Sequence, residues 1–304
     1  MTLDAKTVAD LQNRVSPLMR YAAQTAILPR LGQLQHAEII EKTPGEVVTI
    51  ADRESEQILT EGLLAILPQA RVIGEEACGA QPSLLEGMDE GIVWIVDPLD
   101  GTSNFAAGHE PFGVIVALAE NGVTIAAWLY NPVSDCMCHA TLGRGACVSR
   151  ANEAPRAVEG HGGRGRPIAM LATQFMPKAI ESALVEIAAE SFELQPIPRC
   201  AAEHYAMLAR RENHVALFQR TLPWDHAAGA LFLSESGGMV SRWDGSPYRF
   251  YDNRMGILAA SSREMWRLGR ETLLCDSTPL REVVSTLSPA RHLPDIRAKG
   301  RSRP

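Results

Sequence analysis

The stretch from Trp94 to Phe105 reads Trp-Ile-Val-Asp-Pro-Leu-Asp-Gly-Thr-Ser-Asn-Phe and changes from apolar to polar within a few residues. Its apolar part predicts a buried strand, which we expect to end at Asp97 because Pro98 cannot donate to a central β-ladder. The turn that follows can bring the carboxylates of Asp97 and Asp100 together with the Leu99 carbonyl. Such a cluster of oxygens suits a hard divalent cation.

The residues after Asp100 predict an anion site beside that cation. Gly101 allows the backbone to turn sharply, and Thr102-Ser103-Asn104 is typical of the first turn of a helix. The unpaired amides and the positive dipole end of a helix N-terminus hold anions. The same residue types are also ordinary in turns and helix caps, so this stretch alone leaves open a purely structural role.

The composition is that of a globular protein with excess negative charge. The chain has 304 residues, enough for one large domain or two ordinary ones, with 46% hydrophobic and 21% charged residues. A net charge of -7 argues against a general nucleic-acid binder, so we expect no nucleic-acid partner. The six cysteines form no Cys-x-x-Cys pair and no histidine cluster at zinc-binding spacing.

No segment of the sequence predicts secretion or membrane insertion. The N-terminal residues lack a basic leader followed by an apolar core. No apolar run approaches the roughly 20 residues of a membrane span. We therefore expect a cytoplasmic protein with reduced thiols and no membrane contact.

The first half of the chain predicts helices followed by antiparallel strands. Helical spacing covers residues 4–31 and 51–67, and residues 41–46 and 79–91 read as a polar turn and a loop. The expected strands are 47–50, 71–73, 92–96, 113–119, 123–129 and 136–141. A strong hairpin signal, Asn121-Gly122, separates two of them.

The second half alternates strands and helices, which implies a sheet covered on both sides. Strands are expected at 168–172, 194–197, 215–218, 239–243 and 256–260, and helices at 178–191, 201–210, 227–235 and 263–274. The glycine-rich residues 158–167 read as a flexible crossing. We therefore predict an N-terminal half at 1–157, a C-terminal half at 158–287 and a disordered basic tail at 288–304.

Three motifs together resemble the inositol monophosphatase family of magnesium-dependent phosphatases. They are Gly74-Glu75-Glu76, the Asp97–Phe105 stretch, and Pro223-Trp224-Asp225-His226-Ala227-Ala228-Gly229 followed by Gly237-Gly238. The first motif is weak, whereas the second and third together are specific, and the resemblance extends from about Val47 to Ala260. It implies an α/β protein, a layered αβαβα sandwich of the inositol monophosphatase and fructose-1,6-bisphosphatase type. An α+β half precedes an α/β half, with the site between them.

The resemblance also implies roles for individual residues. Thr102, with Glu75, would position and deprotonate an attacking water, and Asp52 would help a further metal ion. The amides of Gly101, Thr102 and Ser103 would hold the phosphate. Two or three Mg²⁺ ions, with Mn²⁺ possible, would be held by Glu75, Asp97, the Leu99 carbonyl, Asp100 and Asp225. The implied protein is a homodimeric phosphomonoesterase acting on a small phosphorylated metabolite.

The chemistry of these residues supports the resemblance independently. Every expected ligand is an oxygen, which selects Mg²⁺ or Mn²⁺ over Zn²⁺. Two such ions can activate a water and neutralise a phosphate, whereas five converging carboxylates without a cation would repel one another. The spacing Asp-x-x-Asp-Gly-Thr is one residue longer than the haloacid dehalogenase pattern, in which an aspartate is itself phosphorylated. A serine-hydrolase elbow is absent from the sequence.

The substrate side departs from the family pattern. Seven positions before Asp225, where typical members carry an acidic residue that contacts inositol, this chain has Phe218. A segment of usually small residues reads Arg199-Cys200-Ala201-Ala202-Glu203-His204. We expect substrate contacts from Asp100, Arg199, Ala201, Glu203 and Phe218, although Glu203 and His204 also fit an exposed helix face.

The activity is therefore open in two respects. Histidinol phosphate, a nucleotide 3'(2'),5'-bisphosphate and fructose 1,6-bisphosphate stay possible substrates. A partner-binding regulatory module that keeps the fold without turnover is the alternative of a different class. The presence of Thr102 and Glu75 favours the enzyme, because a binding module has no need of a water-activating pair.

Overall fold

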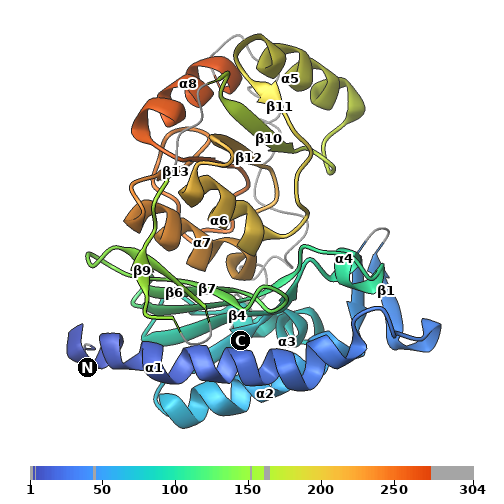
Figure 1. Cartoon of the computed structure of the whole chain (residues 1–304), viewed down its shortest axis with the longest axis vertical. Helices are drawn as coiled ribbons and strands as arrows, with labels where there is room; N and C mark the ends of the chain where they lie inside the picture. The colour runs from blue at the N-terminus through green and yellow to red at the C-terminus, as the bar shows by residue number, and fades with distance from the viewer. Residues whose placement is uncertain (1–2, 4, 44–45, 151–152, 161–164, 275–304) are drawn as a thin grey trace, which may run out of the picture.

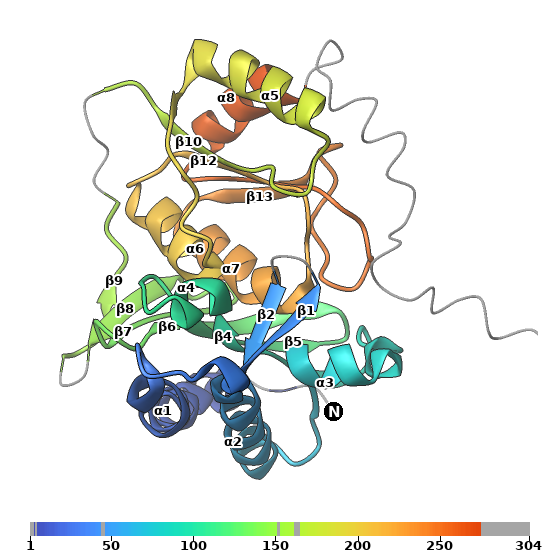
Figure 2. The ribbon, with the colours of Figure 1, turned by 90° about the vertical axis from the view of Figure 1, so that its right-hand side faces the viewer.

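Five layers of helices and sheets are stacked along the long axis of the molecule (Figures 1 and 2). The computed structural model describes residues 3, 5–43, 46–150, 153–160 and 165–274. From one end to the other, the helical layers are α1 (Ala5–Ala22) with α2 (Ile50–Ile66), then α6 (Ala201–Arg210) with α7 (Pro223–Glu235), then α5 (Lys178–Ser191) with α8 (Arg263–Leu273). A β-sheet separates each helical layer from the next, so the predicted α/β fold with αβαβα layering is confirmed.

The first sheet has seven strands, and its neighbours follow chain order. They are β3 (Arg71–Gly74), β4 (Ile92–Asp100), β5 (Gly113–Glu120), β6 (Val123–Asn131), β7 (Cys136–Thr141), β8 (Ala146–Arg150) and β9 (Arg156–Ala157). Only β3 and β4 run parallel. Alternation along β4 fills two cores: Trp94 and Val96 pack on the side of α1 and α2, and Val93 and Ile95 on the side of α6 and α7.

The prediction that the central strand ends before Pro98 is wrong. β4 continues to Asp100, but its pairing with β5 is irregular between Asp97 and Asp100. Pro98 lies in this irregularity, where no ladder hydrogen bond is required of its nitrogen, so proline is tolerated. The Ser55 hydroxyl of α2 donates to the Pro98 carbonyl at 2.8 Å and holds the distorted segment in place.

The second sheet has five strands, with neighbours in the order β11 (Glu193–Leu194), β10 (Ile168–Ala172), β12 (Val215–Phe218), β14 (Ile257–Ala260) and β13 (Met239–Arg242). The first three run parallel, and β14 is antiparallel to both neighbours. The carboxyl ends of β10 and β12 therefore lie at one edge, where open α/β sheets bind ligands.

Several short elements were not predicted. Residues 41–43, expected as a turn, belong to β1 (Ile39–Thr43), which pairs with β2 (Glu46–Thr49). Residues 79–80 end the short helix α3 (Glu75–Ala80), and strand β8 is present where no element was expected. These segments are polar or short, so they carry too few apolar positions to show a period. The helix α4 (Thr102–Ala106) begins at the expected position after Gly101.

The division of the chain at residues 157 and 158 stays a proposal. The first sheet ends with β9 at Ala157, and the second begins with β10 at Ile168. The predicted tail at 288–304 lies outside the described residues. Among the described helices, none combines the length and apolar character that a membrane crossing requires.

Candidate active site

A pocket of about 210 Å³ lies between the two sheets. It is bounded by the end of β4, the first turns of α3, α4, α6 and α7, and the carboxyl ends of β10 and β12. It gathers most of the residues that the sequence singled out, from positions up to 150 residues apart. They are Glu75, Asp97, Leu99, Asp100, Gly101, Thr102, Ser103, Arg199, Ala201, Phe218 and Asp225.

Asp52 connects the start of α2 to Thr102. The Thr49 amide and hydroxyl donate to Asp52 Oδ2 at 2.7 and 2.6 Å, which forms a capping box. Asp52 Oδ1 lies 3.0 Å from the Thr102 hydroxyl, which is also 2.8 Å from the Leu99 carbonyl. This hydroxyl has one proton and two acceptors within reach, so its own lone pairs are open to a hydrogen bond donated by a water. Burial raises the pKa of Asp52 to about 6, although the Thr49 hydrogen bonds act against it.

Asp97 and Asp100 lie at opposite ends of the irregularity in β4. The Leu99 amide donates to Asp97 Oδ1 at 3.1 Å. Asp100 reaches the N-terminus of α6, where it accepts from the amides of Ala201 at 3.0 Å and Ala202 at 2.7 Å and from the Cys200 thiol at 3.0 Å. Burial raises the pKa of both aspartates, and for Asp100 these hydrogen bonds oppose the increase.

Gly101 permits the close contact between the end of β4 in the N-terminal half and the start of α6 in the C-terminal half. Its φ is +81°, in the left-handed region. A Cβ at this position would lie 3.0 Å from the Pro111 carbonyl and 3.2 Å from the Cys200 side chain. Both the backbone conformation and the close approach therefore require glycine.

Glu75 begins α3, whose first turn is held by a carboxylate from α2. Glu56 accepts from the amides of Glu76 and Ala77, both at 2.8 Å. Lys42 of β1 lies 3.5 Å from Glu75 Oε1 and 2.5 Å from Glu76 Oε1. Burial raises the pKa of Glu75 well above its usual range, and the charge of Lys42 partly offsets this. The sequence did not single out Lys42, because it lies in a polar segment without a motif.

Asp225 lies in the first turn of α7, because that helix begins at Pro223 and not near Ala227 as predicted. Burial raises its pKa to about 7, with Arg220 lowering it and Asp100 raising it further, and a hydrogen bond with Asp97 also lowers it. Five oxygen donors around one pocket, with carboxylates that raise one another's pKa, fit a hard cation better than zinc.

These oxygen donors do not already form a metal-coordination site. Within the described part of the chain, no three acidic, imidazole or thiol side chains already form a metal-binding group. Asp97 and Asp100 instead accept hydrogen bonds from backbone amides, and Glu75 lies beside Lys42. A bound ion would share these carboxylates with their present hydrogen-bond donors, because each carboxylate has several lone pairs.

Another part of the pocket is lined by aromatic and imidazole rings. Phe218 ends β12, and its ring centre lies 4.8 Å from those of His204 and His226 and 5.6 Å from that of Tyr205. His226 is held by the Tyr205 hydroxyl and the Arg220 carbonyl, at 3.0 and 3.1 Å. Burial lowers the pKa of both histidines to about 3, so both are neutral at pH 7.

Two substrate-side expectations need correction. His204 is buried and lines the pocket, so it is not part of an exposed helix face. Glu203, expected to contact substrate, pairs with Arg210 at 2.7 Å and borders a separate cavity of about 730 Å³. Successive residues of a helix point about 100° apart, and here His204 faces the pocket while Glu203 faces the other cavity.

Three further lining residues escaped the sequence motifs: Gln174, Phe175 and Arg220. The Arg220 guanidinium lies 4.7 Å from the Phe175 ring centre. Arg220 follows the end of β12, so the rule that ligands bind beyond the carboxyl ends of strands could have found it. Nothing in the sequence around Gln174 and Phe175 indicated that these residues line the pocket.

Without divalent cations, we expect the protein to lose stability as the pH rises from about 5 to about 8. The pKa values of Asp52 and Asp225 are raised to about 6 and 7, so the native state keeps protons that the unfolded chain releases near pH 4. The free energy of unfolding therefore falls as the pH rises through this window. Thermal melts in EDTA should show a falling Tm, and Mg²⁺ should reverse the fall at about pH 8. A Tm that does not change with pH between about 5 and 8 would contradict this explanation.

The comparisons with known proteins agree with the fold. An inositol-1-monophosphatase from Bacillus subtilis (strain 168) is 29% identical over 253 residues, which cover 76% of this chain and 86% of that protein. The Nus factor SuhB of Vibrio cholerae is 32% identical over 238 residues, covering 76% and 85%. The crystal structure of the extragenic suppressor protein suhB from Bartonella henselae has a TM-score of 0.74 at 24% identity, covering 87% of this chain and 98% of that one.

The family model decides the assignment, because it spans nearly the whole described chain. It matches residues 9–276, a range that includes every motif named above. The sequence motifs, the layered fold and this match agree. The chain therefore belongs to the inositol monophosphatase family.

Proposed function

We propose that this protein is a metal-dependent phosphomonoesterase that hydrolyses a small phosphorylated metabolite with water as the nucleophile. One observation carries the proposal: the Thr102 hydroxyl, oriented by Asp52, shares a pocket with four acidic side chains and the Leu99 carbonyl. Acidic residues alone could bind a metal ion with a purely structural role. A hydroxyl whose lone pairs are free to accept from a water adds the means to position a nucleophile.

The metal ligands we propose are Glu75, Asp97, the Leu99 carbonyl, Asp100 and Asp225. They would hold two or three Mg²⁺ ions, with Mn²⁺ as an alternative that the same oxygen ligands accept. Bound there, the ions supply a water of lowered pKa and neutralise charge on the phosphate.

The residues of the chain itself supply orientation and proton transfer. Thr102 would accept a hydrogen bond from the attacking water while its hydroxyl keeps its own proton and donates a hydrogen bond to Asp52 or to the Leu99 carbonyl. Glu75, whose pKa is raised by burial, is the base that takes the water's proton. The amides of Gly101, Thr102 and Ser103, where α4 begins, hold the phosphate oxygens.

Phosphate release is the direct test. Inositol 1-phosphate, histidinol phosphate, adenosine 3',5'-bisphosphate and fructose 1,6-bisphosphate would each be assayed with and without Mg²⁺. Thr102→Ala should lower kcat by about 100-fold or more, because it removes the group that orients the nucleophile. Thr102→Ser keeps the hydroxyl and serves as the matched control, with activity within about tenfold of the unchanged protein. Turnover without divalent cations, or an unaffected Thr102→Ala variant, would refute the proposal.

A partner-binding role is the second candidate, because a relative that is 32% identical is named as a Nus factor. In that case, a folded protein that binds Mg²⁺ would release no phosphate from any substrate in the panel. Its function would be lost on deletion of residues 288–304 and unaffected by Asp100→Asn. Activity that depends on Asp100 and not on these terminal residues would exclude this candidate.

Two further expectations from the sequence remain proposals: a homodimer and a cytoplasmic location. The resemblance to the family supports the first, and the composition supports the second. Light scattering coupled to size-exclusion chromatography measures the molar mass in solution, and a value of one chain, near 33 kDa, would refute the homodimer.

A further inference from the structure

The pocket has two chemically different sides. One side carries the carboxylates of Glu75, Asp97, Asp100 and Asp225. The lining residues between positions 172 and 220, within the described chain, include Arg199, Arg220 and two phenylalanines but no carboxylate. This part of the lining is therefore positively charged and partly aromatic.

Arg199 is held at the mouth of the pocket in an unfavourable backbone conformation. Its φ is +55°, in the left-handed region that side chains with a Cβ rarely adopt. Its carbonyl lies 3.3 Å from where a Gly101 Cβ would be, so the backbone is closely packed against the end of β4. The side chain is exposed and makes no ion pair with any residue that the structure describes. Strained residues of this kind concentrate where ligands are clamped.

Arg220 and Phe175 form a flat platform that lines the same pocket as Arg199. The Arg220 guanidinium lies 4.7 Å from the Phe175 ring centre, and Phe175 is 46% exposed. Phe218 adds a second ring at the bottom of the pocket, at the end of β12. A guanidinium over an aromatic ring offers hydrogen-bond donors at its edge and an apolar surface beside it.

We infer that the substrate is a phosphate ester whose leaving group carries a second anionic group. That anion binds to Arg199 and Arg220, and a flat apolar part of the leaving group packs on Phe175 and Phe218. Arginine only donates hydrogen bonds and phenylalanine offers none, so apart from Gln174 and His204 the side chains in this part of the lining give the hydroxyls of a neutral polyol few acceptors. An anion, by contrast, accepts from arginine in a bidentate arrangement. The inference rests on the proposed phosphatase function and specifies its substrate class.

A matched pair of substrates tests the second anion. Adenosine 3'-phosphate and adenosine 3',5'-bisphosphate differ only in the 5'-phosphate, and release of the 3'-phosphate would be followed for both. We expect kcat/KM to be at least about tenfold higher for the bisphosphate, with the preference shrinking as salt screens the arginines. Inositol 1-phosphate, whose leaving group is an uncharged polyol, should be a poorer substrate than either.

A matched pair of variants tests Arg199. Arg199→Gly relieves the left-handed backbone, so the variant should fold, and its preference for the bisphosphate should fall at least fivefold through a raised KM. Arg211→Gly is the control, because Arg211 is also exposed, has φ +61° and lies outside the pocket at the end of α6. Its substrate preference should not change. Arg220 is less suitable for such a substitution test, because its charge also lowers the pKa of Asp225.

The outcomes separate the inference from the function on which it rests. No turnover on any phosphate ester would overturn the proposed function. Equal turnover of both adenosine phosphates would leave the phosphatase standing and overturn the second-anion inference. A preference for the bisphosphate that Arg199→Gly leaves unchanged would also overturn it, because the assigned contact would then be wrong.

Discussion

Replacement of Asp225 by asparagine is expected to abolish phosphate release and, at the same time, to raise the melting temperature of the metal-free protein. Asparagine keeps the shape of the side chain in the first turn of α7 but cannot supply a negative ligand. Loss of one such ligand removes several kcal/mol of charge stabilisation, so we expect kcat to fall by about 1,000-fold or more.

The gain in stability follows from the direction in which burial moves the pKa. Burial raises the pKa of Asp225 to about 7, so its ionised form is unfavourable in the native state. A tenfold change in an acid dissociation constant corresponds to about 1.4 kcal/mol between the two protonation states. Above about pH 7 the substitution removes this cost, and a gain of about 1 kcal/mol raises the Tm of a chain of this size by about 2–4 °C. Calorimetry at about pH 8 in EDTA measures the change.

Asp244→Asn is the matched control. Although partial burial acts in the opposite direction, hydrogen bonds from Ser246 and the charge of Arg254 lower the pKa of Asp244 to about 2. Its ionised form is therefore favoured in the native state, so the same substitution should lower the Tm at neutral pH and leave turnover intact. An Asp225→Asn variant that is active, or less stable than the metal-free parent, would show that Asp225 is a structural residue.

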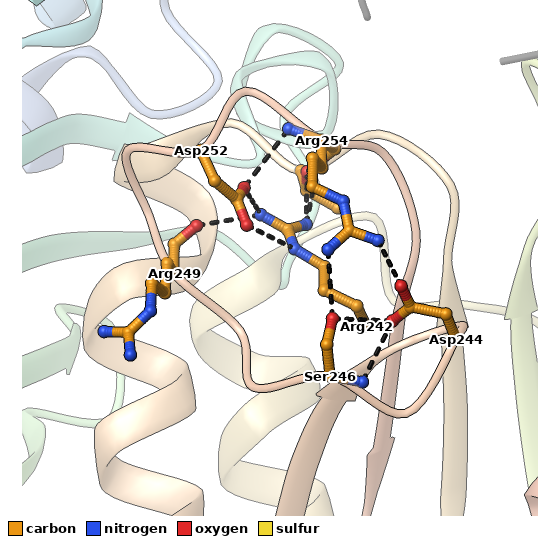
Figure 3. Close-up of polar contacts among 7 residues, drawn as sticks. Arg242, Asp244, Ser246, Arg249, Asp252 and Arg254 are labelled. Atoms are coloured by element: carbon orange, nitrogen blue, oxygen red, sulfur yellow. Dashed lines mark hydrogen bonds and ion pairs between the residues drawn. The ribbon is translucent and has the colours of Figure 1, made fainter. Parts of the chain in front are cut away.

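Replacement of Arg242 by methionine is expected to lower the free energy of unfolding by about 3–5 kcal/mol, the range for breaking a buried ion pair. Arg242, the last residue of β13, is 1% exposed, and its guanidinium lies at the centre of the loop that follows the strand (Figure 3). Its guanidinium pairs with Asp252 and donates to the carbonyls of Arg249 at 2.8 Å and Arg254 at 2.7 Å. Methionine replaces the aliphatic part of the arginine side chain but leaves all these acceptors unpaired.

The effect of Arg242 should extend to the pocket. Its guanidinium also donates to the Thr221 hydroxyl at 3.0 Å, in the segment that joins Arg220 to α7. Arg242→Met should therefore raise KM as well as reduce stability. Arg254→Met is the control, because that side chain is 45% exposed and pairs with Asp244 at the surface, where ion pairs contribute about 0–1 kcal/mol. Urea unfolding measures both variants, and equal small losses would contradict the central role of Arg242.

Local signals in the sequence predicted much of the framework. The helix at 178–191, the helix at 201–210 and the strand at 215–218 have the bounds that their apolar spacing indicated. The same reasoning failed at Pro98, because a residue that cannot pair in a regular ladder is allowed where the ladder is already broken. It also failed at β1, whose pairing with β2 forms a strand from a polar segment.

The candidate site divides in the same way. The sequence alone indicated which acidic and hydroxyl groups the site contains. It also placed them at strand ends and in first helical turns, because turn geometry is local. The tertiary structure decided which wall each side chain faces. His204 lines the pocket while its neighbour Glu203 faces another cavity, and Lys42, Phe175 and Arg220 enter from three separate segments. These placements depend on how helices rotate and sheets stack against one another, which no stretch of sequence specifies alone.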